Sequence, residues 1–245
     1  MKNIFVVSDI HGHLTHFEQL LTQWNKQDRL VILGDLIDRG PDSLGVIRKV
    51  MSLCQTHGDN VLFIKGNHED ILINFLQSPI EKQENYYLNG GLETLASFFQ
   101  PLQLAIPSSV EEIVAIIQSH YADELAFIQS APHVSTIGQV LLTHAGFNSE
   151  YADYTKTTER EYIWIRKHYL SPNLTPYVNV FGHTPIHYIN GQHDIYVNEL
   201  QNYIAIDGGC YMTGQLNGLL IHEDGNILAK HKVILPLPQG GTTYD

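Results

Sequence analysis

The sequence has few cysteines and little positive charge. Its 245 residues include two cysteines, Cys54 and Cys210, which lie far apart along the chain. This argues against a disulfide framework and is typical of a reducing compartment. Lysine and arginine total 14 against 26 aspartate and glutamate residues, a formal net charge of −12 at pH 7. Such a balance argues against the broad basic surface that nucleic-acid binding requires.

The sequence also lacks a long hydrophobic run. The apolar stretch Ile4–Val7 near the start is followed at once by polar residues. It is too short for the apolar part of a secretion signal, and no later run reaches the length of a membrane span. We therefore expect a cytoplasmic protein that contacts neither membrane nor nucleic acid.

What is present is the composition of a globular domain, with 43% hydrophobic and 16% charged residues. A chain of this length can bury a substantial core. No linker rich in proline or serine divides it, so we expect one domain over residues 1–245. Histidine is unusually frequent: there are 14, as many as lysine and arginine together.

Strand-like and helix-like patterns alternate in the first third of the chain. Short apolar runs predict strands, and apolar residues at helical spacing predict helices between them. The strands are expected at 3–9, 29–35 and 60–67, and the helices at 13–24, 43–54 and 69–77. This alternation indicates an α/β protein with a largely parallel sheet.

The middle of the chain, about residues 78–130, reads as a helical insertion. One helix is predicted at 90–99 and a longer one at 109–129, where Ser109 and Glu112 form a start signal. Strands resume afterwards, at 135–146, 178–184, 202–209, 216–224 and 225–235. Their hairpin-like turns predict a more antiparallel second half.

Five polar motifs follow predicted strands. They are SDIHGH at 8–13, GDLIDRG at 34–40, KGNHED at 65–70, THAG at 143–146 and FGHTP at 181–185. Ligand sites of open α/β sheets gather outside the carboxyl ends of the strands. We therefore expect one rim to hold the side chains of Asp9, His11, Asp35, Asn67, His68, His144 and His183.

The residue types at this rim favour a metal centre. Carboxylate, amide and imidazole groups suit divalent ions such as Mn²⁺, Fe²⁺ or Zn²⁺. Six ligands from this set of seven residues would suit two ions if one carboxylate bridges, and two ions can act together on phosphorus. Each motif alone has a simpler explanation, such as a solvated turn at 34–43 or an N-cap at Asn67. Their joint occurrence at strand ends favours the metal site.

Taken as a set, these motifs resemble the phosphoprotein phosphatase branch of the calcineurin-like metallophosphoesterases. The resemblance extends from about Asn3 to Leu220, and NGGLETL at 89–95 and IWIR at 163–166 also resemble the small bacterial members. It implies a sandwich of two mixed sheets flanked by helices. It also implies two divalent ions, with Mn²⁺ as the leading choice and Fe²⁺, Zn²⁺, Co²⁺ or Ni²⁺ as alternatives.

The resemblance implies a role for each site residue. Asp9 and His11 would hold the first ion, Asp35 would bridge, and Asn67, His144 and His183 would complete the second. His68 would be the general acid, oriented by Asp38. Arg39 and Arg166 would bind phosphate oxygens, although Arg166 could equally face solvent on a helix. A hydroxide bridging the ions would attack phosphorus directly.

The resemblance does not determine the substrate. The leading expectation is a bis(5'-nucleosyl)-tetraphosphatase, acting on diadenosine tetraphosphate. The alternative is a protein serine/threonine phosphatase acting on a phosphoprotein, and a more remote alternative is a non-catalytic metal-binding scaffold.

Some polar residues near the motifs have no expected chemical role. Asp42 is expected to start a helix, and His13, His16 and the remaining histidines are expected to be surface or packing residues.

Overall fold

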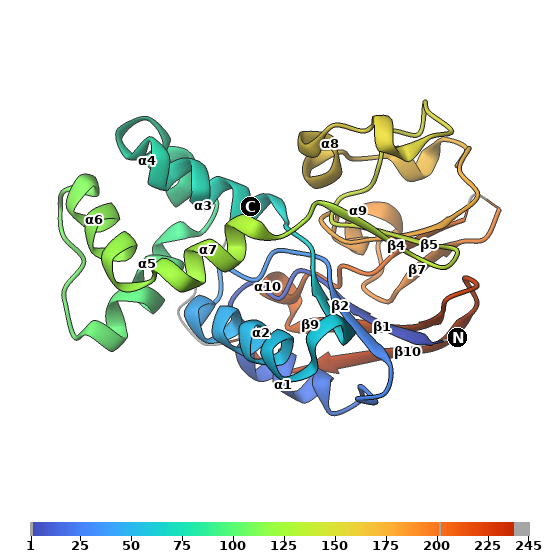
Figure 1. The fold of residues 1–245 in the computed structure, drawn as a ribbon, viewed down its shortest axis with the longest axis horizontal. Helices are drawn as coiled ribbons and strands as arrows, with labels where there is room; N and C mark the ends of the chain where they lie inside the picture. Colours follow the sequence, from blue (N-terminus) through green and yellow to red (C-terminus); the bar gives the residue numbers. More distant parts are fainter. Residues whose placement is uncertain (1, 201, 238–245) are drawn as a thin grey trace.

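The computed structural model describes residues 2–200 and 202–237. It contains two five-stranded mixed sheets that face each other, with helices on their outer faces (Figure 1). The first sheet has the strand order β10-β9-β1-β2-β3 and the second the order β4-β5-β6-β8-β7. The expected α/β sandwich of two mixed sheets is confirmed.

Each sheet combines three parallel strands with two antiparallel ones. In the first sheet β1, β2 and β3 are parallel, and β9 and β10 continue as an antiparallel pair. In the second sheet β5, β6 and β8 are parallel, with β4 and β7 antiparallel at the edges. The strand bounds are β1 (Asn3–Val7), β2 (Arg29–Ile32), β3 (Val61–Phe63), β4 (Val134–Ile137), β5 (Val140–Thr143), β6 (Val178–Phe181), β7 (Tyr196–Asn198), β8 (Tyr203–Ala205), β9 (Gln215–His222) and β10 (Ile227–Ile234).

Strand β1 contributes side chains to two separate hydrophobic cores, one on each of its faces. Ile4 and Val6 enter the apolar cluster between the sheets, with residues such as Val180 of the second sheet. Phe5 and Val7 belong instead to the cluster on the helix-covered face. Successive strand residues point to opposite faces, so β1 must be apolar on both sides, which explains its continuous hydrophobic sequence.

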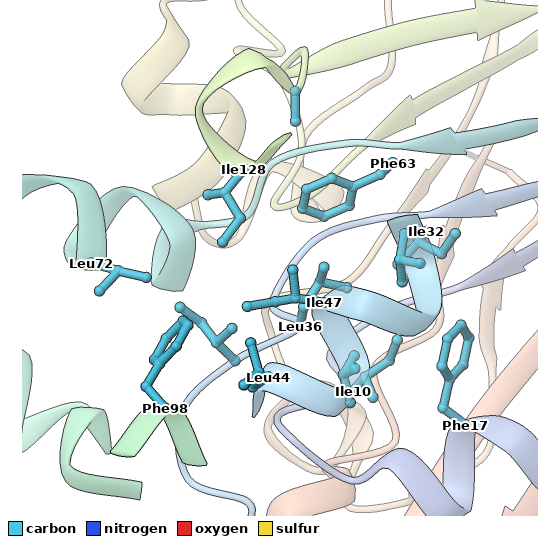
Figure 2. Close-up of a cluster of buried hydrophobic side chains, with 14 of the residues drawn as sticks. Ile10, Phe17, Ile32, Leu36, Leu44, Ile47, Phe63, Leu72, Phe98 and Ile128 are labelled. Carbon is cyan, nitrogen blue, oxygen red and sulfur yellow. The ribbon is translucent and has the colours of Figure 1, made fainter. Parts of the chain in front are cut away.

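The outer face of the first sheet is covered by α1 (Leu14–Leu21) and α2 (Ser43–His57). Figure 2 shows Leu72, Phe98 and Ile128 gathered around Leu44 and Ile47 of α2. The helices that carry them therefore share one core with the sheet. The second sheet is covered by α8 (Glu159–Trp164) and α9 (Ile186–Asn190), around a separate apolar cluster.

Five helices follow one another between β3 and β4 and lie together on one side of the molecule (Figure 1). They are α3 (Asn67–Gln77), α4 (Pro79–Leu88), α5 (Gly91–Phe99), α6 (Val110–His120) and α7 (Ala122–Ser130). The prediction of one helix at 109–129 is wrong, because the helix is interrupted at Tyr121 and two helices form instead. The Tyr121 ring is buried 4.7 Å from the ring of Phe98, and its hydroxyl donates to the Phe98 carbonyl. This tertiary contact holds Tyr121 out of the helix.

The remaining helical elements are short. They are α10 (Cys210–Thr213) and the 3₁₀ turns η1 (Gly58–Asn60), η2 (Gln100–Leu102), η3 (Tyr154–Lys156) and η4 (His168–Leu170). Asp42 is the N-cap of α2, where its side chain accepts a hydrogen bond of 2.8 Å from the Gly45 amide. Within residues 2–200 and 202–237, no helix has the length and apolar character needed to span a bilayer.

Candidate active site

Loops after five parallel strands bring the predicted rim together. Asp9 follows β1, Asp35 follows β2, His68 follows β3, His144 follows β5 and His183 follows β6. All seven residues expected at the rim are buried, none more than 6% exposed. The carboxyl ends of parallel strands meet at one edge of a sheet. Two such edges, one from each sheet, therefore enclose the site.

Asp35 lies at the centre of this group. The Nε2 atoms of His11 and His68 lie 3.6 and 3.9 Å from its Oδ2 atom. On the other side, His144 Nε2 lies 3.4 Å from Asp35 Oδ1. One carboxylate thus faces imidazoles with both of its oxygens.

Backbone carbonyls select the tautomer of two of these histidines. His11 Nδ1 lies 2.8 Å from the Ile37 carbonyl oxygen, and His144 Nδ1 lies 2.6 Å from that of Leu33. A carbonyl only accepts, so each Nδ1 carries the proton and each Nε2 keeps its lone pair. Such contacts orient metal-binding histidines. Both Nε2 atoms are therefore prepared to bind a cation near Asp35.

The side chains form two overlapping groups suited to metal ions. One contains His11, Asp35 and His68, and the other contains Asp35, His144 and His183, with potential ligand atoms within 4.8 Å of one another in each. His183 Nε2 is buried without a hydrogen-bond partner. A metal ion would satisfy that nitrogen, and Asp35 belongs to both groups as a bridging carboxylate would.

Asn67 lies beside the second group. Its Oδ1 atom is 2.9 Å from His144 Nε2. Because His144 carries its proton on Nδ1, two acceptors face each other across this distance. A shared cation would make the contact favourable, so the donor set fits a divalent ion here. Asn67 is not the N-cap of α3, a position occupied by Gly66.

Asp9 lies at the edge of the group and belongs to neither set of three. Its carboxylate accepts hydrogen bonds from the Ser8 hydroxyl and, at 3.0 Å, from the His183 amide. Burial and the carboxylate of Asp207 raise the pKa of Asp9, and burial and Asp9 raise the pKa of Asp35. Divalent cations would offset this concentration of carboxylates. Asp207 was missed in the sequence, although it too follows a strand, β8.

His68 and Asp38 form a buried pair. His68 Nδ1 lies 2.7 Å from Asp38 Oδ2, and the Thr94 hydroxyl donates to Asp38 Oδ1 at 2.6 Å. Burial raises the pKa of Asp38 and lowers that of His68, which the Arg39 charge lowers further. Thr94 belongs to the NGGLETL segment, whose role the sequence did not specify. The Thr94 hydroxyl holds the Asp38 carboxylate in place, and that carboxylate in turn orients the ring of His68.

Two guanidinium groups lie beside the proposed metal residues. Arg39 Nη1 is 3.1 Å from His11 Nε2, and the guanidinium carbon lies 4.0 Å from the centre of the Tyr211 ring. Arg166 Nη1 lies 3.4 Å from the His183 carbonyl oxygen. Arg166 follows α8 rather than lying within it, and its side chain is exposed to solvent. Tyr211 was not predicted, because only the fold brings α10 next to Arg39.

The loops are held in uncommon backbone conformations. Nine described residues other than glycine have positive φ, and six of them are site residues: Asp9, His11, Asp35, Asp38, Arg39 and His183. Such conformations cost energy and persist where the surroundings enforce them. Gly34, at φ 86°, leaves no room for a side chain, because a Cβ would lie 2.5 Å from Gly66 Cα. The glycine permits two loops to touch.

Glu69 holds those loops together. Its carboxylate accepts hydrogen bonds from the amides of Asp35 at 2.9 Å, Leu36 at 2.7 Å and Gly66 at 2.8 Å. Glu69 is fully buried. It is one residue after His68 in the GNHE motif, and its sequence context does not distinguish it from an ordinary glutamate at the start of a helix.

The chain is similar to known phosphatases. It matches the calcineurin-like phosphoesterase family over residues 2–210. The asymmetrical bis(5'-nucleosyl)-tetraphosphatase PrpE of Anoxybacillus flavithermus is 26% identical in an alignment of 251 positions that covers 89% of this chain and 90% of the relative. A symmetrical bis(5'-nucleosyl)-tetraphosphatase of Buchnera aphidicola is 43% identical over 89 residues, which cover 35% of this chain and 31% of the relative.

Solved structures show the same fold. A candidate diadenosine tetraphosphatase superposes with a TM-score of 0.59 at 21% identity, covering 95% of this chain and 93% of the other. A protein serine/threonine phosphatase of Saccharomyces cerevisiae gives a TM-score of 0.56 at 14% identity, covering 98% and 82%. At these identities the likeness concerns the fold alone.

Buried nitrogen and oxygen ligands, a histidine paired with a carboxylate, and two arginines form a set suited to phosphoryl transfer. The family match covers most of the chain and includes these strand-end motifs. Its members use divalent metal ions to hydrolyse phosphoester or phosphoanhydride bonds, which makes this chain a hydrolase of phosphorylated substrates. The chain belongs to the calcineurin-like phosphoesterase family.

Proposed function

We propose that this chain is a bis(5'-nucleosyl)-tetraphosphatase, which hydrolyses the phosphoanhydride chain of diadenosine tetraphosphate in the presence of two divalent metal ions. The observation that carries the hydrolytic part is Asp35, which belongs to two groups of potential metal ligands at once. The substrate is supported by the relative aligned with 89% of the chain, whose name states this activity.

The proposed metal ligands are distributed over both sheets. Asp9, His11 and Asp35 would hold one ion, and Asp35, Asn67, His144 and His183 the other. The ions, with Mn²⁺ as our proposal, would polarise the phosphoryl group and supply hydroxide at neutral pH.

His68 is proposed to protonate the leaving oxygen. Its Nδ1 atom is bonded to Asp38, so Nε2 is the nitrogen that remains for the substrate. Burial lowers the pKa of His68 in this structure. A phosphate chain brings negative charge next to the ring, which raises that pKa and favours the protonated acid. Asp38 acts through His68 by holding the ring and stabilising its positive charge.

Arg39 and Arg166 are proposed to bind phosphate oxygens. A planar guanidinium can donate two parallel hydrogen bonds to a phosphate, which both fixes and neutralises it. In a chain with a formal net charge of −12, a polyanionic substrate needs such local positive charge. The two arginines approach from the loop after β2 and from the segment after α8.

A side-by-side assay tests this proposal. With Mn²⁺ present, kcat/KM would be measured on diadenosine tetraphosphate and on a phosphothreonine peptide, with His68→Asn as an inactive control and Glu84→Gln, on an exposed face of α4, as a matched neutral control. We expect the dinucleotide to be strongly preferred. ADP alone would show symmetrical cleavage, and AMP plus ATP asymmetrical cleavage.

Two other outcomes would overturn the proposal. A preference for the peptide would make the chain a protein serine/threonine phosphatase. Activity on neither substrate, with two ions bound per chain, would support the metal-binding scaffold instead.

A further inference from the structure

A second cluster of metal-ligating side chains lies outside the proposed catalytic centre. It consists of His13, His16 and Cys210, whose potential ligand atoms lie within 4.8 Å of one another. The three residues are 5%, 4% and 1% exposed. His13 precedes α1, His16 lies in its first turn, and Cys210 begins α10. The fold therefore brings the thiol of Cys210, from the last fifth of the chain, next to the imidazoles of His13 and His16 near its start.

Hydrogen bonds within the cluster do not satisfy its buried polar atoms. His13 Nε2 is buried and has no hydrogen-bond partner. Among the described residues, no hydrogen bond joins the three side chains to each other; His16 Nε2 reaches the Leu235 carbonyl oxygen at 3.3 Å. The rings of His13 and His16 are 5.1 Å apart. Leaving a buried nitrogen unpaired is unfavourable, and a bound cation would remove that cost.

The donor chemistry distinguishes this cluster from the centre around Asp35. Two imidazoles and a thiolate suit Zn²⁺ and related thiophilic ions, whereas the centre around Asp35 offers nitrogen and oxygen donors and no thiol. His13 and His16 are three residues apart, which places them on the same side of a helical turn. We propose that His13, His16 and Cys210 form a third, mononuclear metal site that binds Zn²⁺ or a similarly thiophilic divalent ion.

Metal binding at this site must displace a proton. Burial and the carboxylates of Asp207 and Asp9 raise the pKa of the Cys210 thiol, so the metal-free side chain is protonated. The ion would replace that proton, forming the metal–sulfur bond and releasing one H⁺ to solvent. The two imidazoles bind in their neutral form and release none.

The site would connect α1 to α10, next to the proposed catalytic centre. Tyr211 follows Cys210, and its ring contacts both the Arg39 guanidinium and, at 5.2 Å between ring centres, His11. An ion bound to Cys210 would fix the start of α10 and with it the position of Tyr211. The third site is therefore structural in our proposal, and it does not depend on the proposed substrate.

Cobalt spectroscopy tests the site directly. Purified protein would be dialysed to saturation with Co²⁺, and its near-ultraviolet absorption recorded. A thiolate bound to Co²⁺ gives a charge-transfer band, which the nitrogen and oxygen ligands around Asp35 cannot give. We expect the band in the wild type and in Cys54→Ser, its loss in Cys210→Ser, and its disappearance on addition of excess Zn²⁺. Bound zinc should reach three ions per chain in the wild type and two in Cys210→Ser.

A second variant protects the test against misfolding. His13→Gln keeps both thiols, and its band should be weakened or lost while its circular dichroism is unchanged. Absence of the band in saturated wild-type protein, or an equal band in Cys210→Ser, would overturn the proposal. A wild-type band in a chain that hydrolyses neither test substrate would refute the proposed function and leave the third site standing.

Discussion

His68 Nδ1 lies 2.7 Å from Asp38 Oδ2 in a fully buried contact between the first turn of α3 and the loop after β2. Thr94, from α5, donates its hydroxyl to the other oxygen of Asp38. The ring of His68 is thus positioned through a chain of hydrogen bonds that begins in the helical segment after β3. This arrangement connects the helices to the chemistry proposed at Asp35.

The first prediction concerns this pair. His68→Asn should lower kcat by about 10²–10⁴-fold, because that is the usual contribution of general acid catalysis. Metal content should not change. Asp38→Asn should also lower kcat, and the double variant should be little worse than His68→Asn, since Asp38 acts through His68. If His68→Asn instead released metal and kept its activity per bound ion, His68 would be a ligand and not the acid.

The second prediction concerns Asp35, which faces imidazoles with both oxygens. In the Cys210→Ser background, which removes the proposed third site, Asp35→Asn should reduce the metal content below two ions per chain, because a neutral amide is a poor bridge between cations. Elemental analysis after dialysis would measure this, with the exposed Asp59→Asn as control. Two tightly retained ions in Asp35→Asn in that background would contradict the bridging role.

The third prediction concerns Glu69, which accepts hydrogen bonds from three backbone amides. Glu69→Gln should lower the free energy of unfolding by about 1–3 kcal/mol, because the amide nitrogen cannot accept and leaves buried N–H groups unpaired. Urea unfolding in the presence of a chelator would measure the change without a contribution from metal. Glu84→Gln, on an exposed face, should be within experimental error of the wild type.

The fourth prediction concerns pH and His168, whose ring is packed between Phe181 and Tyr203. Burial lowers its pKa to about 4. The unfolded chain binds this proton near pH 6.5 and the folded chain near pH 4, so unfolding takes up a proton between these values and stability falls as the pH decreases. The loss attributable to His168 should approach about 3 kcal/mol below pH 4.

Comparing the wild type with His168→Phe isolates that contribution. The free energy of unfolding of His168→Phe should depend less on pH between 6.5 and 4. The exposed His120→Phe should keep the wild-type dependence. Parallel curves for the wild type and His168→Phe would show that the His168 pKa is not depressed.

Much of the fold could be predicted from local sequence patterns. The apolar runs before residues 8, 33 and 64 form parallel strands, and polar motifs follow them. Because parallel strands end at one edge, the sequence alone was enough to place the seven rim residues near each other. Hydrogen bonds at helix starts were also predictable, because they join residues three positions apart. Asp42 caps α2, and the Ser109 hydroxyl accepts from the Glu112 amide.

What the sequence could not provide were contacts between distant segments. Glu69 and Asp207 carry no signal beyond a helix start and a strand end, and Tyr211 approaches Arg39 only because α10 folds back on the loop after β2. The break at Tyr121 likewise depends on a distant neighbour, Phe98, whose carbonyl accepts a hydrogen bond from the Tyr121 hydroxyl.

The histidines show the same division. The sequence by itself determined where strands end and which ligand types follow them, because hydrophobic periodicity and loop composition are local properties. Only the tertiary structure decided that His13 and His16 are buried against Cys210 and that Asp35 is shared by two groups of ligands. Those relationships depend on how two sheets and their loops pack, and no local pattern records that packing.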